Sequence, residues 1–473
     1  MRLGRSALTM TTAEMAAGRW ARARRVAAFA VGALAMTGPA ILNGYPLLYP
    51  DSMTYLEDGR RVARALFLHQ TSAYYGMRSL LYSLVILPLH RNVDPWPVVV
   101  LQALLTAWLL WLTVRSIARG HQAVKYVATV VVLSVATSLS WYVSLIMPDI
   151  LGPVLYLAIY LLVFARETLA RWEKWVLVAV AWWAAASHAT HLMLGVGLCT
   201  VLAAVLALRR DWPRMRGVAE AALALVLAVG VPMALNVYLY GTPSVQGESP
   251  PYLTARTIAD GPGRWYAERD CGQRFAVCAY AGRFPDDADG FLWDPAGIYH
   301  IAPKSVQKQM EKQDVAFALA AARRYPWAQL RRSMANFRDQ LLTFGVDDFD
   351  PNDWLLSQFD TTLPGRKAQY ERTRQARDLL PMEAFTTVQN WAVLAALVAM
   401  GILLPLVGRV HAERLRPLAL AAITALVVVG NALVTGTMST LDERLQSRVV
   451  WLLPLAAVML LLAWMDRKRP SRG

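Results

Sequence analysis

Long runs of apolar residues determine what this chain can fold into. Several runs reach the ~20 residues that an α-helix needs to cross a bilayer, and residues 126–165 carry a single charge, Asp149. Of 473 residues, 56% are hydrophobic and 17% are charged, whereas soluble domains carry about a quarter charged residues. The sequence therefore predicts an all-α polytopic membrane protein.

Basic residues gather in short segments between the apolar runs, at 115–125, 166–174, 209–216 and 409–416. A formal net charge of +15 suits nucleic acid, but this placement is typical of loops retained in the cytoplasm. We therefore expect the membrane, and no nucleic acid, as partner. The resulting topology has about ten crossings of the cytoplasmic (inner) membrane and places both termini in the cytoplasm.

The chain divides into four parts by composition. We expect a cytoplasmic N-terminal segment (1–25), a transmembrane module (26–240), a small extracytoplasmic (periplasmic) domain (241–385) and C-terminal transmembrane helices (386–473). In the first outer loop, residues 52–95, the charges from Glu57 to Arg64 indicate a surface helix. The apolar run 77–89 is too short to cross, so we predict interfacial helices there.

This topology gathers several polar residues on the outer face. Asp51 follows the first apolar run, Asp149 lies between two crossings, His188 and His191 interrupt the run 175–208, and Arg444 and Arg448 precede the last run. Arginine binds phosphate oxygens through a planar fork, and a carboxylate accepts a proton from an attacking hydroxyl. Plainer alternatives are a helix cap for Asp51, packing for the histidines and interfacial anchoring for the arginines.

The cysteines indicate one disulfide. Cys271 and Cys278 lie in the long polar loop with six residues between them, whereas Cys199 lies in an apolar run and suits packing. An oxidising compartment would favour a bond between Cys271 and Cys278, and two unrelated thiols are the alternative. No Cys/His spacing resembles a structural zinc site.

Short motifs resemble integral-membrane glycosyltransferases of the GT-C superfamily, which use polyprenyl-phosphate sugar donors. The family's first-loop acid is similar to Asp51 in Tyr-Pro-Asp-Ser, and its second-loop acid to Asp149 in Met-Pro-Asp-Ile-Leu. The segment that begins at Arg78 resembles the interfacial stretch of the family but lacks the prolines of that stretch. His188 to His191 falls where many members of the family have a break between two short helices, but the lysine that the family carries there is absent from this sequence. The segment that begins at Arg448 resembles the start of a late helix in the family.

The resemblance implies a fold, a reaction and roles. An acceptor hydroxyl or amine attacks the anomeric carbon, and polyprenyl phosphate leaves with inversion. Asp51 would be the general base, or bind a metal or the acceptor, and Asp149 would be its acceptor or metal partner. Arg78, His188, His191, Arg444 and Arg448 would bind the substrate. The partners are a polyprenyl-phosphate-linked sugar and a lipid or glycan acceptor; a divalent metal stays open as cofactor.

Two other classes of protein fit the same layout. A lipid or glycan transporter (flippase) also carries polar residues at membrane depth, although transporters place their sites near the midplane, often with repeat symmetry. Here the charges lie at one surface, and no repeat is visible. A non-catalytic envelope-assembly protein, working through residues 241–385, is the other alternative.

Overall fold

The computed structural model describes residues 12–70, 78–241, 243–245, 249–347, 349–408 and 415–466. Within these ranges the chain is helical, and its one β-type pairing is an isolated parallel bridge between Leu47 and Leu145. The all-α prediction is therefore confirmed. Two predicted features fall largely or partly outside the described residues: the start of the N-terminal segment 1–25, before Thr12, and most of the turn 409–416.

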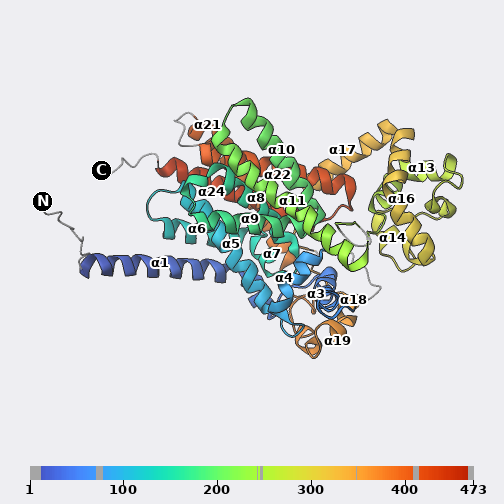
Figure 1. Ribbon diagram of the computed structural model, residues 1–473, viewed down its shortest axis with the longest axis horizontal. Helices are drawn as coiled ribbons and strands as arrows, with labels where there is room; N and C mark the ends of the chain where they lie inside the picture. Colours follow the sequence, from blue (N-terminus) through green and yellow to red (C-terminus); the bar gives the residue numbers. More distant parts are fainter. Residues whose placement is uncertain are drawn as a thin grey trace.

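The first half of the chain builds most of the helical bundle (Figure 1). Its α-helices and short 3-10 helices are α1 (Thr12–Met36), α2 (Gly38–Asn43), α3 (Pro50–Leu68), α4 (Leu80–His90), α5 (Trp96–Ile117), α6 (Gln122–Ala136), α7 (Leu139–Ser144), η1 (Pro148–Ile150), α8 (Leu151–Phe164), η2 (Arg166–Thr168), α9 (Arg171–Ala186), α10 (Ala189–Leu208) and α11 (Trp212–Tyr240). The predicted interruption of the run 175–208 is confirmed near His188, because α9 ends at Ala186 and α10 begins at Ala189.

The second half builds a lobe at one end of the bundle and then returns to it (Figure 1). Its helices are α12 (Tyr252–Ala259), α13 (Pro262–Arg269), η3 (Ala276–Tyr280), α14 (Ala288–Leu292), α15 (Ile298–Ile301), α16 (Lys304–Arg324), α17 (Pro326–Leu342), α18 (Asp353–Ser357), α19 (Phe359–Thr362), α20 (Lys367–Tyr370), α21 (Met382–Gly408), α22 (Leu415–Met438), α23 (Glu443–Val450) and α24 (Leu452–Met465).

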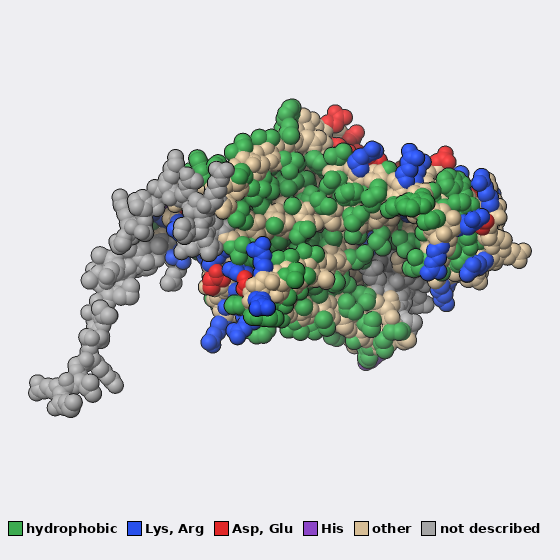
Figure 2. All heavy atoms as spheres, turned by 90° about the horizontal axis from the view of Figure 1, so that it is seen from above, with side chains coloured by type: hydrophobic (Ala, Val, Ile, Leu, Met, Phe, Trp, Pro, Cys, Tyr) green, Lys and Arg blue, Asp and Glu red, His purple; other side chains and the backbone are tan. Residues whose placement is uncertain are grey.

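Six described helices are long and apolar enough to cross a membrane. These segments are Trp96–Ile117, Ala189–Leu208, Trp212–Leu239, Met382–Gly408, Leu415–Met438 and Glu443–Met465. Shorter apolar helices cover Leu80–His90, Gln122–Ala136 and Pro148–Phe164. Hydrophobic side chains cover the middle of the molecule, and Lys and Arg gather toward its ends (Figure 2). This is the surface of a membrane protein.

The lobe formed by α12 to α16 has a hydrophobic core of its own. Phe291, Phe317 and Ile298 are fully buried in it and lie in a cluster separate from the core of the bundle. Cys271 and Cys278 belong to this cluster and are joined by a disulfide, with their Cα atoms 6.3 Å apart. The lobe lies at the end of the bundle opposite the start of α1 and the end of α24 (Figure 1).

Helix α3 packs tightly on α4 through a glycine. A Cβ atom at Gly59 would lie 2.5 Å from the carbonyl oxygen of Ser83 and 3.3 Å from Leu87 Cβ. Because real Cβ atoms do not approach backbone oxygens this closely, any larger residue at position 59 must separate the two helices. Glycine therefore sets how closely α3, which carries Asp51 in its first turn, approaches α4.

Gly59→Ala should destabilise the protein, although alanine normally stabilises a helix interior by roughly 0.5–1 kcal/mol. Overpacking of a tight contact typically costs ~1–3 kcal/mol, which exceeds that gain. Gly230→Ala in α11 is the matched control, because a Cβ atom there has no neighbour within 4 Å. Thermal unfolding in detergent should lower the midpoint only for Gly59→Ala; equal midpoints would contradict the packing account.

Candidate functional site

Asp51 and Asp149 each follow one residue of the parallel bridge between Leu47 and Leu145. The Leu47 amide donates to the Ser144 carbonyl at 3.0 Å, and the Ile146 amide donates to the Leu47 carbonyl at 3.0 Å. Each acid follows its bridge residue by four positions, directly after a proline that opens a helical turn. Proline suits this first position because its missing N–H has no helical partner. The pairing therefore brings two sequence-distant Pro-Asp turns together.

Two buried amides fix these extended segments. Gln375 brackets Leu48: its side chain accepts from the Leu48 amide at 3.2 Å and donates to the Leu48 carbonyl at 2.6 Å. Gln102 donates to the carbonyls of Val143 and Leu145 at 2.9 and 2.8 Å. The two side chains satisfy backbone groups of Leu48 and Leu145 and a carbonyl in the last turn of α7, as buried backbone requires.

Asp51 forms an ion pair with Arg78, which precedes α4. Both side chains are partly exposed, at 19% and 18%. Tyr252, the first residue of α12 in the lobe, lies near Arg78 and within electrostatic range of Asp51. The lobe therefore contributes a side chain to this pair.

Asp149 is buried between two arginines of α23. Its carboxylate lies 3.6 Å from Arg444 and 3.5 Å from Arg448, and only 2% of its side chain is exposed. Four positions separate the two arginines, so they lie on one face of α23. Arg448, 1% exposed, also donates to the Asn431 side chain at 3.1 Å. Arg448 is thus embedded beneath the site rather than open to a ligand.

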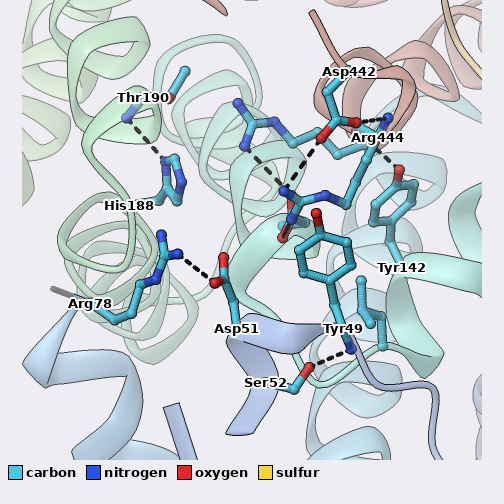
Figure 3. Close-up of polar contacts among 12 residues, drawn as sticks. Tyr49, Asp51, Ser52, Arg78, Tyr142, His188, Thr190, Asp442 and Arg444 are labelled. Carbon is cyan, nitrogen blue, oxygen red and sulfur yellow. Dashed lines mark hydrogen bonds and ion pairs between the residues drawn. The ribbon is translucent and has the colours of Figure 1, made fainter. Parts of the chain in front are cut away.

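Arg444 contacts an aromatic ring as well as carboxylates. Its guanidinium carbon lies 4.1 Å from the centre of the Tyr49 ring, a cation–π distance. It also pairs with Asp442 at 3.7 Å, and Asp51 is among its electrostatic neighbours. His188 and Arg78 lie on one side of the site and Arg444 and Asp442 on the other, with Asp51 and Tyr49 between them (Figure 3).

The two histidines lie near the arginines of the site, at the junction of α9 and α10. His188 caps α10 by accepting a hydrogen bond from the Thr190 amide at 3.2 Å. His191 is buried, its Nδ1 atom lies 3.1 Å from the Ala184 carbonyl, and its ring lies against Gly152. Arg448 is an electrostatic neighbour of both rings. These contacts match the plainer packing role for His191, while His188 also lies near Arg78 and Arg444.

The structure therefore gathers every residue that the sequence placed on the outer face at one end of the bundle. It adds Tyr252, Asp442 and Tyr49 as direct neighbours and Gln102 and Gln375 as supports. Asp442 and Tyr49 lie in the same short stretches as predicted site residues. No sequence pattern identifies the other three as residues of the site. In the part of the chain that the structure describes, no group of three or more His, Cys, Asp or Glu could hold a metal ion.

The chain matches no protein-family model, no curated protein and no solved structure. The geometry of its own residues must therefore carry the functional argument.

Asp58 corrects the expectation of a solvated charged helix in the first outer loop. Its side chain is only 3% exposed, and its ion pair with Arg61 spans 3.7 Å. Neither carboxylate oxygen accepts a hydrogen bond from a described residue. Burial, opposed by Arg61, raises the pKa of Asp58 to about 7. Helix α3 therefore presents Glu57, Arg60 and Arg61 at its partly exposed side and turns Asp58 inward.

The raised pKa of Asp58 predicts a pH-dependent stability. An unfolded chain releases this proton near pH 3.8, whereas the folded chain holds it to about pH 7. Between these values the folded state binds more protons, so stability falls as the pH rises through the window. Asp58→Asn should therefore raise the unfolding midpoint more at pH 8 than at pH 5. The control Asp360→Asn, at an exposed position, should change the midpoint by the same small amount at pH 5 and at pH 8. An equal change at the two pH values for Asp58→Asn would contradict the raised pKa of Asp58.

Breaking the buried pair at Asp149 should destabilise the protein. Removing one partner of a buried ion pair typically costs ~3–5 kcal/mol, so Arg448→Ala should lower the thermal midpoint strongly. Arg338→Ala is the control, since Arg338 pairs with Asp339 while 69% of its side chain is exposed. Such surface pairs contribute about 0–1 kcal/mol. A midpoint for Arg448→Ala equal to that of Arg338→Ala would contradict a structural role.

Proposed function

We propose that this protein is an inverting GT-C-type glycosyltransferase that moves a sugar from a polyprenyl-phosphate donor to an acceptor at the outer face of the cytoplasmic membrane. The observation that carries the proposal is the partly exposed Asp51–Arg78 pair beside Arg444 at one end of an apolar bundle. It joins an acid with two phosphate-binding cations. The apolar helices beside it suit a lipid-linked substrate.

The proposed reaction assigns each charge a task. The Asp51 carboxylate takes the proton of the acceptor hydroxyl or amine as that group attacks the anomeric carbon. The bond from this carbon to the phosphate oxygen breaks, and polyprenyl phosphate leaves with the electron pair. Arg78 and Arg444 stabilise the charge that grows on the leaving phosphate, as preorganised donors do in low-dielectric sites.

Asp149 and Arg448 act indirectly in this proposal. Asp149 touches both Arg444 and Arg448, and Arg448 is anchored on Asn431. They hold Arg444 over Tyr49, where its fork can reach a phosphate. This assigns Arg448 a positioning role, whereas the sequence had suggested direct binding. The proposal includes the ten-crossing topology with both termini cytoplasmic and the lobe outside, because donor and acceptor then meet at the outer leaflet.

The site also favours transfer over transport. Its charges lie within electrostatic range of Tyr252, the first residue of α12 in the lobe. A transport pathway would need such groups near the bilayer midplane.

Asp51→Asn should remove the base while keeping the shape of the side chain. General-base catalysis contributes about 10²–10⁴-fold, so turnover should fall by about that factor in a lipid-reconstituted assay of sugar transfer. Asp94→Asn is the control: Asp94 accepts a 3.1 Å hydrogen bond from the Trp96 amide, which asparagine can also accept, and its ion pair with Arg366 spans 4.0 Å. Full transfer by Asp51→Asn would rule out Asp51 as the base.

A further inference from the structure

The arginines of the site are already matched by carboxylates. Arg78 pairs with Asp51, Arg448 with Asp149, and Arg444 with Asp149 and Asp442. Three guanidinium groups thus face three carboxylates, and their formal charges cancel. An anionic ligand that enters this site must therefore compete with a carboxylate for whichever arginine it binds.

The three arginines differ in how easily an anionic ligand can displace their carboxylate partners. Arg448 is 1% exposed and hydrogen-bonded to Asn431. Arg444 is 11% exposed, lies over Tyr49 and faces two carboxylates. Arg78 is 18% exposed and its partner Asp51 is 19% exposed. The Asp51–Arg78 pair is the one that a phosphate reaches with the least loss of other contacts.

We propose that the donor phosphate takes Arg78 from Asp51, so that donor binding itself releases the base. This inference rests on the proposed function and adds a mechanism of control to it. In the structure, Asp51 Oδ1 accepts a hydrogen bond from the Arg78 guanidinium. A phosphate offers the same fork more oxygens and more negative charge than a carboxylate does, and it binds arginine in a bidentate manner.

Tyr252 holds Arg78 during this exchange. Because Tyr252 belongs to the lobe and not to α3, its interaction with Arg78 does not depend on Asp51. Arg78 can therefore leave Asp51 and remain near the site. Arg444 lies within electrostatic range of both Arg78 and Asp51, so it attracts the same phosphate and keeps the freed carboxylate close.

The exchange orders the reaction. Before the donor binds, the acceptor and water meet a carboxylate that is occupied by Arg78. After the donor binds, Asp51 is free at the side of the sugar that the acceptor must attack. The donor therefore binds first, and the base becomes available only when there is a sugar to transfer.

The test measures binding rather than transfer. The full-length protein, purified in detergent, is titrated by calorimetry with a short-chain polyprenyl monophosphate that carries no sugar. Since an ion pair of this exposure is worth up to about 1 kcal/mol, Asp51→Asn should bind this probe about fivefold more tightly than wild type. Asp51→Glu keeps the competing carboxylate and should bind as wild type does. Asp51→Ser should repeat the gain and replaces Asp51→Asn if that variant fails to fold.

Two controls locate the gain. Adding Arg78→Ala to Asp51→Asn should abolish it, because the freed guanidinium is then missing. The uncharged polyprenol should bind all variants equally, since its tail does not sense the pair. If wild type binds the phosphate but Asp51→Asn binds it no more tightly, the exchange is refuted while the proposed function stands. If wild type does not bind the phosphate at all, the donor class, and with it the proposed function, is wrong.

Discussion

The need to pair every charge at the end of an apolar bundle shapes this structure. An isolated carboxylate in such a place would carry a desolvation cost of several kcal/mol. Asp149 is placed between Arg444 and Arg448, and Asp51 against Arg78. These partners come from α23 and from the turn before α4, far from the acids in sequence. The Leu47–Leu145 pairing and the α23 helix are therefore parts of one electrostatic arrangement.

The lobe takes part in the same arrangement. Tyr252 reaches Arg78, and α17 holds the start of α23, because the Gln340 side chain donates to the Asp442 carbonyl at 2.8 Å and accepts from its amide at 3.2 Å. Asp442 in turn caps α23, which carries Arg444 and Arg448. The lobe and the α17 helix that follows it thus lie against opposite sides of the site.

The sequence predicted much of the fold and the acids of the site, but it did not predict which residues contact those acids. Long apolar runs, Pro-Asp turns and a histidine-interrupted helix are local signals, so the helix break before α10 and the candidate acids were visible. The partners of those acids depend on contacts between distant segments. Asp58 shows the limit: its charged neighbours predict a solvated helix, but packing of α3 on α4 through Gly59 turns it inward. Gln102, Gln375 and Tyr252 act through backbone or side-chain contacts that carry no sequence pattern.

The most direct test of the account is mass spectrometry of lipid-linked and envelope glycans. Cells that lack the protein should accumulate a glycan or lipid short of one sugar, together with the polyprenyl-phosphate-linked form of that sugar. Wild-type protein should restore the profile, and Asp51→Asn, present at the same level, should not. Identical profiles with and without the protein, or equal restoration by Asp51→Asn, would contradict the account.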